Sequence, residues 1–220
     1  MKGQTRRIKL ADASLLWMSG ATLVHVMFDD RLRRATLEVG EAELTVAPGG
    51  RAFELTAGDR LMRTQAADVD LARYPRQGVL TTVLTVRSGE VAVGQVGQRD
   101  PARILHAGEQ MRWADGQAAS ATREVDPNAA FAWQTRKLVY AQSPLSDVAA
   151  DLNRYLDRPI AIAEPSVERM LFTGTLPIDR EDRILRRLEA ALPVRALVRR
   201  DTVTLIARKT ASGPPHRPAQ

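Results

Sequence analysis

The side chains that most often perform catalysis or hold metals are few in this sequence and lie far apart. The 220 residues include no cysteine, which excludes thiol catalysis, thiolate metal sites and disulfides. The three histidines, His25, His106 and His216, have no second histidine or cysteine at the short spacings of metal sites. We therefore predict that the protein binds no metal and no cofactor.

Other catalytic motifs are equally weak. The stretch SGEVAVGQVGQRD (residues 88–100) is rich in glycine, but it lacks the Lys-Ser/Thr pair of a phosphate loop and does not open a helix. Asp29 and Asp30 lie in the stretch FDDRLRR, which has the pattern of a turn that closes a hairpin rather than of an acid/base pair. No serine stands in a G-x-S-x-G motif. We predict that the protein is not an enzyme.

The basic charge of the chain does not indicate a nucleic-acid partner. The formal net charge is +6, from 32 Lys+Arg and 26 Asp+Glu, and the isoelectric point is about 10.3. A nucleic-acid surface needs basic residues gathered in a stripe or patch, and here the excess is thin and scattered along the chain. Recognition of a binding partner is the function class that remains.

The last apolar stretch, VRALVRRDTVTLIARK (residues 194–209), is the best candidate for such recognition. It predicts a final hairpin, and an edge strand of a small sheet offers unpaired N–H and C=O groups to a partner strand. Basic side chains along an edge can either prevent aggregation or bind an acidic docking partner, and the sequence leaves both roles open. The predicted partner-binding residues are Arg195, Leu197, Arg199, Arg200, Thr202, Thr204 and Arg208.

The first half of the chain has the pattern of β-structure. Short runs between residues 6 and 113 alternate apolar and polar positions, and turn residues separate them. Four Gly-acid pairs fall inside these runs, and glycine allows the positive φ of tight turns. We therefore expect hairpin corners at Gly40, Gly58, Gly89 and Gly108, and an all-β domain of short stacked hairpins over residues 1–113.

The second half repeats a small unit. Residues 138–163 and 171–198 each contain an apolar run, an amphipathic helix, a proline and another apolar run. Helices between strands of one sheet favour right-handed β-α-β crossovers, with the helices on one face. The predicted fold class is thus mixed α/β, with the all-β domain followed by a small β-α-β/β-α-β domain over residues 131–209. Residues 114–130 are expected to be a linker, and residues 210–220 a disordered tail.

The two predicted helices have recognisable ends. Ser143 and Pro144 suit the start of the first helix and Pro159 its end, whereas Asp179 and Pro193 bound the second. Apolar residues at spacings of three and four form the buried faces, Leu145, Val148, Ala149, Leu152, Tyr155 and Leu156 in the first and Ile184, Leu185, Leu188, Ala191 and Leu192 in the second.

Over nearly all of residues 6–209, the sequence resembles a known family, the FecR-type sigma-factor regulators. In the second half the similarity rests on an apolar strand after a tryptophan, a Pro-Leu helix start, an Arg-Tyr pair and the flanking glycine and proline, namely Trp133, Pro144, Leu145, Val148, Leu152, Arg154, Tyr155, Gly174, Leu185, Leu188, Pro193 and Val194. In the first half it rests on the Gly-Glu turns and on the strand that begins at Arg51, namely Gly40, Glu41, Ala42, Arg51 and Phe53, with TVRSGEVAVGQ and ILHAGEQMRW.

The resemblance implies a function and a location. Such regulators are anchored in the inner membrane by one helix, and a cytoplasmic segment controls an extracytoplasmic-function sigma factor. Their periplasmic part senses an outer-membrane TonB-dependent transporter, usually for ferric siderophores. Neither the membrane helix nor the cytoplasmic segment is recognisable here, because no apolar run approaches about 18 residues. We therefore expect this chain to be the periplasmic part.

The resemblance also implies a role for the doubled unit. It is similar to the secretin/TonB short N-terminal (STN) domain found in such transporters and in secretins. The partner is then the N-terminal signalling domain of the transporter, and the two related modules are expected to pair edge to edge. Gly174 is expected to be a structural turn within this unit.

Two departures from the family pattern are informative. Many members have Asp-Gly-Ser near the first strand, where this chain has Asp12-Ala13-Ser14. Some members cleave themselves at a Gly-Thr bond, but the corresponding stretch here, LMRTQAADVDLARY, has none, and Gly174-Thr175 lies in the other domain. Self-cleavage is not expected. The alternative function is a non-catalytic envelope β protein that binds a glycan or a protein.

Overall fold

The computed structural model of the protein describes residues 4–29, 32–76, 78–98 and 103–208. Strands account for 53% of the described residues and helices for 16%. The chain divides into two compact units: Met1–Ala141 with Gly174–Ile178, and Gln142–Thr173 with Asp179–Gln220.

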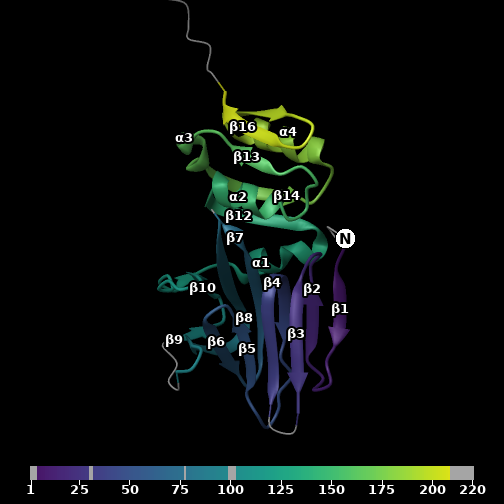
Figure 1. Cartoon of the computed structure of the whole chain (residues 1–220), viewed down its shortest axis with the longest axis vertical. Coiled ribbons are helices and arrows are strands. Elements are labelled where there is room, and N and C mark those ends of the chain that lie inside the picture. The colour runs from purple at the N-terminus through teal and green to yellow at the C-terminus, as the bar shows by residue number, and fades with distance from the viewer. Residues whose placement is uncertain (1–3, 30–31, 77, 99–102, 209–220) are drawn as a thin grey trace, which may run out of the picture. The chain divides into compact units, whose positions relative to one another are not determined.

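Most strands belong to the first unit (Figure 1). Their bounds are β1 (Arg6–Lys9), β2 (Leu15–Met18), β3 (Leu23–Phe28), β4 (Arg33–Thr45), β5 (Phe53–Ala57), β6 (Arg60–Thr64), β7 (Ala67–Arg76), β8 (Val79–Gln95), β9 (Arg103–His106), β10 (Glu109–Ala114) and β11 (Arg123–Glu124). Two short helices follow, α1 (Pro127–Phe131) and the 3-10 helix η1 (Ala132–Thr135).

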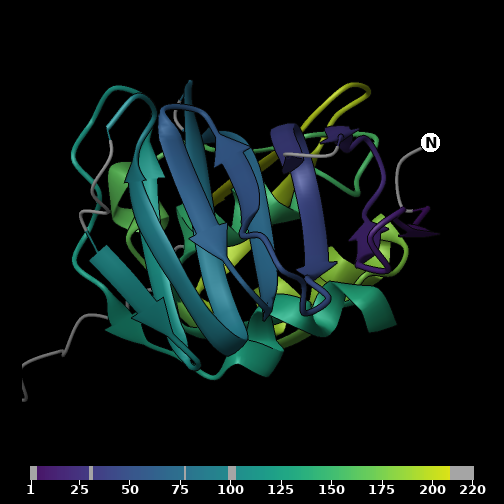
Figure 2. The ribbon, with the colours of Figure 1, turned by 90° about the horizontal axis from the view of Figure 1, so that it is seen from below.

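Strands β4, β5, β6, β8 and β7 form a closed ring of pairings among the described residues. β4 pairs with β5 and β7, β5 with β6, and β8 with both β6 and β7. Closure is possible because β4 and β8 are 13 and 17 residues long, so that each bonds to different neighbours along its length. The curved strands are seen from below in Figure 2. Side chains from the ring and from β9 and β10 form the core, with Leu37, Phe53, Leu71, Leu84, Leu105 and Trp113 each at most 2% exposed.

The long strands change the role of two glycines. Gly58 lies between β5 and β6 and Gly108 between β9 and β10, but Gly40 and Gly89 lie inside β4 and β8 rather than at hairpin corners. Gly40 has a φ of +112°, and a Cβ there would stand 2.4 Å from the Cα of Thr22. Gly89 lies next to a register shift between β7 and β8. These two glycines therefore mark irregularities within continuous strands, where a side chain would not fit.

The second unit contains the remaining elements. Their bounds are α2 (Leu145–Leu152), β13 (Ile160–Ile162), α3 (Pro165–Glu168), α4 (Glu181–Ala191), β15 (Val194–Val198) and β16 (Val203–Ala207). β12 (Lys137–Pro144) and β14 (Leu171–Pro177) pair with each other, and each has residues in both units. Gly174 lies inside β14, with a φ of +149°. The other sheet has the order β13-β16-β15, with β13 parallel and β15 antiparallel to β16.

The prediction of a mixed α/β fold with a repeated β-α-β domain is wrong. The described residues are mostly β, with a closed ring of strands. α2 connects β12 to β13 and α4 connects β14 to β15, and in both cases the two strands lie in different sheets. Neither helix is therefore a crossover within one sheet. Hydrophobic periodicity identifies strands and helices, but which strands pair depends on residues far apart in the sequence. The two strands within each similar segment therefore do not pair with each other.

The helices bury most of the apolar faces expected from their spacing, although Ala191, expected on the buried face of the second helix, is exposed. Val148 and Leu152 of α2 and Ile184 and Leu188 of α4 are fully buried. The N-caps differ from those expected, because they are Pro144 and Arg180, and neither side chain bonds to the helix backbone.

The segment expected to be a linker is structured. Residues 114–130 include β11, which pairs with β10, and the first residues of α1. The two compact units divide at Ala141 instead. The expected tail, residues 210–220, lies outside the described residues. None of the described helices has both the length and the apolar character needed to cross a bilayer.

Candidate protein-docking surface

The three-stranded sheet of the second unit places several of the predicted docking residues on one face. Arg195 is opposite Ile206 and Leu197 is opposite Thr204 in the β15–β16 ladder. Val194, Val203 and Leu205, at alternate positions, are fully buried on the other face. We call Arg195, Leu197, Thr204 and Ile206 the outer face. Arg195 is exposed and the other three are half-buried.

Arg199 and Arg200 extend this surface at the corner between β15 and β16, where both are exposed. The corner is held by the N–H of Arg199, which donates to the carbonyl of Thr202 at 2.9 Å. In the described part of the chain, no acidic side chain forms an ion pair with Arg195, Arg199 or Arg200. These three guanidinium groups can therefore accept carboxylates from outside the unit.

Two of the predicted residues have internal partners. The Thr202 hydroxyl donates to the carbonyl of Pro159 at 3.0 Å, and so joins the hairpin corner to the start of β13. The Arg208 guanidinium donates to the carbonyls of Glu189 at 2.6 Å and Val194 at 3.2 Å. Arg208 thus binds the last turn of α4, where a cation is favourable. Both contacts hold the unit together.

The outward edge of β15 is less open than the sequence suggests. Ladder alternation directs the N–H of Ala196 away from β16, and this N–H donates to Glu189 Oε1 at 2.7 Å. A partner strand added here must first displace the Glu189 carboxylate. The sequence analysis missed Glu189, because only the folded position of α4 brings this side chain to β15. The sequence feature that could have indicated it is an acidic residue on the polar face of the last turn of the predicted helix.

The opposite edge, β13, is closed in a similar way. Asn153 Nδ2 donates to the carbonyl of Ile160 at 3.0 Å, and the N–H of Ile160 donates to Asn153 Oδ1 at 2.6 Å. One amide side chain thus replaces a neighbouring strand at this residue. The outer face and the hairpin corner are therefore more accessible to a partner than either edge.

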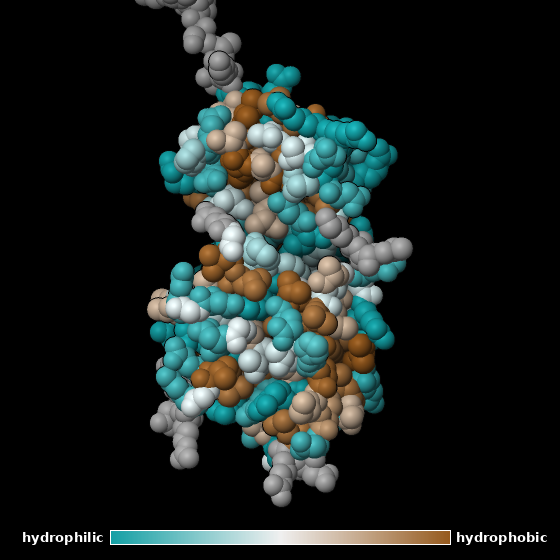
Figure 3. Space-filling view, viewed as in Figure 1, coloured by the Kyte–Doolittle hydropathy of each residue, from teal (hydrophilic) through white to brown (hydrophobic). Residues whose placement is uncertain are grey.

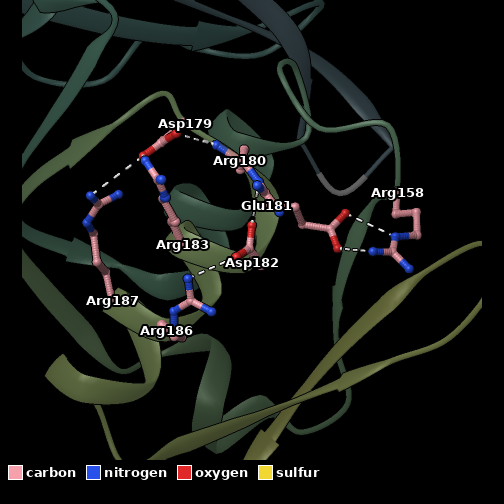
Figure 4. A network of polar contacts seen from close by, with 8 residues as sticks. All are labelled: Arg158, Asp179, Arg180, Glu181, Asp182, Arg183, Arg186 and Arg187. Carbon is pink, nitrogen blue, oxygen red and sulfur yellow. Dashed lines mark hydrogen bonds and ion pairs between the residues drawn. The ribbon is translucent and has the colours of Figure 1, made fainter.

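The arginines of α4 and its flanks differ from Arg195, Arg199 and Arg200 because they form ion pairs with acidic side chains (Figure 4). Arg183 donates to Asp179 at 3.2 Å and Arg186 to Asp182 at 2.9 Å. Backbone hydrogen bonding from the N–H of Arg180, and then the Arg183 guanidinium, lower the pKa of Asp179. The remaining members of the network are Arg158, which pairs with Glu181, and Arg187.

A second polar cluster lies in the first unit, beneath the short helices. Arg87 Nη2 donates to Glu43 Oε1 at 2.6 Å and Arg87 Nε to Asp68 Oδ2 at 2.9 Å. Burial, followed by the nearby Asp68 carboxylate, raises the pKa of Glu43. Gln134 of η1 donates to Glu43, and Arg87 lies 3.9 Å from the ring centroid of Phe131. The cluster therefore fixes the helical segment 127–135 to the β-structure.

Trp133 provides the most buried contact of that segment. Its Nε1 donates to Asp70 Oδ1 at 2.9 Å, and both residues are 2% exposed. Its ring also packs edge-on against Trp17, with ring centroids 6.0 Å apart. The sequence analysis placed Trp133 in the second domain, whereas the structure places it in the first unit.

The comparisons with known proteins concern the fold. No known protein family and no curated protein matches the sequence. Two crystal structures from Parabacteroides distasonis ATCC 8503, each described as a “putative anti-sigma factor”, are similar in fold. The structure at 1.65 Å matches with a TM-score of 0.80 at 18% identity, over 94% of this chain and 96% of that chain. The structure at 2.50 Å matches with a TM-score of 0.78 at 17% identity, over 94% of this chain and 95% of that chain. This chain therefore shares the fold of those proteins.

Proposed function

We propose that the protein is a regulatory module of a sigma-factor regulator and acts by binding another protein. The observation that carries the proposal is the likeness of fold to the two anti-sigma factor structures over nearly the whole of both chains. The resemblance of the sequence to FecR-type regulators points the same way. A regulator of this kind needs no catalytic group, since it acts by changing the balance between conformations of its partners.

The finer proposal concerns place and partner. We infer that the module works in the periplasm and docks the N-terminal signalling domain of a TonB-dependent siderophore transporter. An extracytoplasmic-function sigma factor would be bound by a cytoplasmic segment outside this chain. The outer face and the hairpin corner support this assignment, because Arg195, Arg199 and Arg200 are exposed and form no ion pair with a described acidic residue. Half-buried apolar and hydroxyl side chains accompany them on the outer face. An acidic protein surface fits that arrangement.

The docking is assigned to the outer face and hairpin corner and not to a strand edge. Glu189 occupies the outward N–H of Ala196 on β15, and Asn153 occupies both backbone groups of Ile160 on β13. A partner strand would have to displace these side chains, and the hydrogen bonds it made at these positions would only replace existing ones. Side-chain contacts on the face require no such exchange.

The proposal is tested by calorimetric titration of the protein with the signalling domain of the transporter encoded beside it. Micromolar or tighter binding, which weakens as salt is added, is the expected result. A signalling domain from an unrelated transporter is the matched control and should bind at least about tenfold more weakly. Equal binding of both domains, or no binding to either, would refute docking of a specific transporter.

A further inference from the structure

Strands β2 and β3 follow one another along the same side of β4. β2 pairs antiparallel with Ala42–Thr45, and after a short interruption β3 pairs antiparallel with Arg33–Val39. β1 pairs with β2 from the outside, but β3 pairs only with β4 among the described strands. The first unit thus has a six-residue edge at β3, in addition to the edges at β1, β9 and β11, each of which pairs with one strand among those described.

The backbone groups along this edge can be identified from the hairpin that follows. Asp29 and Leu32 exchange both hydrogen bonds, at 3.1 and 3.4 Å. Because hydrogen-bonded and non-hydrogen-bonded pairs alternate along an antiparallel ladder, the N–H and C=O groups of His25 and Met27 point toward β4. The N–H and C=O groups of Val24, Val26 and Phe28 point away from it. No neighbouring strand and no capping side chain meets these groups in the described part of the chain.

The side chains of β3 are unusual for a free edge. The strand reads LVHVMF and contains no Lys, Arg, Asp, Glu, Pro or Gly. Leu23 is 49% exposed, Val26 38% and Met27 60%. Figure 3 shows apolar side chains gathered over this side of the first unit. Natural proteins usually protect edge strands with charges, prolines or a covering element, as Glu189 and Asn153 do in the second unit.

We propose that β3 pairs with β3 of a second copy of this chain, antiparallel across a two-fold axis at Val26. In this register Val26 faces Val26 of the other copy, Val24 faces Phe28 and His25 faces Met27. The outward backbone groups of each strand then bond to those of the other, and two sheets join into one.

The second copy is favoured as occupant because the strand is complementary to itself. It carries no charged residue, so the antiparallel register brings no like charges together. β-branched and aromatic side chains face each other, which favours pairing in sheets. An antiparallel two-fold contact also closes on itself, so the assembly stops at the dimer.

The expected dimer is weak. One pair of six-residue strands buries less surface than a standard protein interface, so a dissociation constant of roughly 10 µM to 1 mM is expected. Sedimentation equilibrium of the whole chain over that concentration range measures it. Val26→Lys places two ammonium groups across the axis and should weaken association at least about tenfold. Val198→Lys, at an exposed position of β15 in the second unit, should leave it unchanged.

A cross-linking experiment tests the register. The chain has no cysteine, so Val26→Cys introduces a single thiol per copy. Directly opposed residues of a hydrogen-bonded pair have Cα atoms about 5.5 Å apart, within reach of a disulfide. Under mild oxidation this variant should form disulfide dimers several-fold faster than Val198→Cys, although position 198 is the more exposed. A monomeric wild type at the highest concentration, a dimer that survives Val26→Lys, or equal cross-linking of the two cysteine variants would each overturn the proposal.

Discussion

At the scale of single residues, the stability of the first unit depends on buried charged side chains that form ion pairs and hydrogen bonds. Arg73 is 5% exposed and donates to both carboxylate oxygens of Asp115, at 2.7 and 2.6 Å. It also donates to the carbonyl of Glu38 at 2.9 Å and to the Thr82 hydroxyl at 3.0 Å. This single side chain therefore connects three strands to the turn after β10. Hydrogen bonding from Arg73 lowers the pKa of Asp115.

Replacing Asp115 by asparagine tests this ion pair. We expect Asp115→Asn to lower the free energy of unfolding by about 1–3 kcal/mol near neutral pH, because the buried guanidinium loses a charged partner. A lowered folded-state pKa stabilises the protein above the ordinary value of 3.8, and the stabilisation is lost as the pH falls below it. Urea unfolding at about pH 7 and about pH 3 measures both effects. A difference between variant and wild type that does not shrink in acid would contradict the account.

Gly40 provides a second test at the residue scale. A Cβ at this position would meet the backbone of Thr22 at 2.4 Å, whereas Gly97 also has a positive φ but open space around it. Both Gly40→Ala and Gly97→Ala suffer conformational strain, of about 1 kcal/mol or more. Only Gly40→Ala must also displace a backbone, so its loss of stability should be clearly the larger in thermal denaturation. Equal losses would show that crowding at Thr22 plays no part.

At the scale of elements, the helical segment 127–135 is the feature that sequence patterns describe least well. Its residues are small and polar at first, which is typical of a linker. The structure fixes it by three contacts, Trp133 with Asp70, Gln134 with Glu43, and Phe131 with Arg87. Each contact joins residues more than 40 positions apart, so none of them is visible in a local window.

Trp133→Phe tests the contact with Asp70. Phenylalanine keeps most of the packing but removes the Nε1 donor, so the buried Asp70 carboxylate loses a charge-assisted hydrogen bond. We expect a loss of about 1.5–3 kcal/mol in urea unfolding followed by circular dichroism. The control is Trp17→Phe, which changes the ring that packs against Trp133 and removes no hydrogen bond between described side chains. A loss no larger than that of the control would show that the hydrogen bond contributes little.

The same scale explains what the sequence could and could not predict. The spacing of Val148 with Leu152 and of Ile184 with Leu188 predicted α2 and α4, and these residues are buried. The apolar stretch at residues 194–209 predicted a final hairpin, and β15 pairs antiparallel with β16. The pairing of β12 with β14 and of β13 with β16 was not predictable, because it requires contacts between distant segments. Glu189 and Asn153 were missed for the same reason.

At the scale of the whole molecule, the chain consists of two compact units with different uses of their sheet edges. The first closes five of its strands into a ring and leaves the outer edge of β3 without a neighbouring strand among those described. The second has a small open sheet whose edges are capped by side chains and whose corner carries Arg199 and Arg200. On this account the two units offer two different surfaces, an apolar edge for a second copy and a basic face for a signalling partner.

The proposed docking surface makes a prediction about charge. Arg199→Glu with Arg200→Glu should weaken binding of the transporter signalling domain at least about tenfold, because two cations facing an acidic surface become anions. The control reverses Arg103 and Arg123, exposed arginines of the first unit whose guanidinium groups bond to neutral groups among the described residues. It changes the net charge by the same amount.

The measurement that tests the central claim most directly is calorimetric titration of these two double variants and the wild type with the signalling domain. The account predicts a large loss of affinity for the Arg199/Arg200 variant and near wild-type affinity for the Arg103/Arg123 variant. Equal affinities for all three proteins would contradict docking at the corner of β15 and β16. Equal losses in both variants would show that only net charge matters.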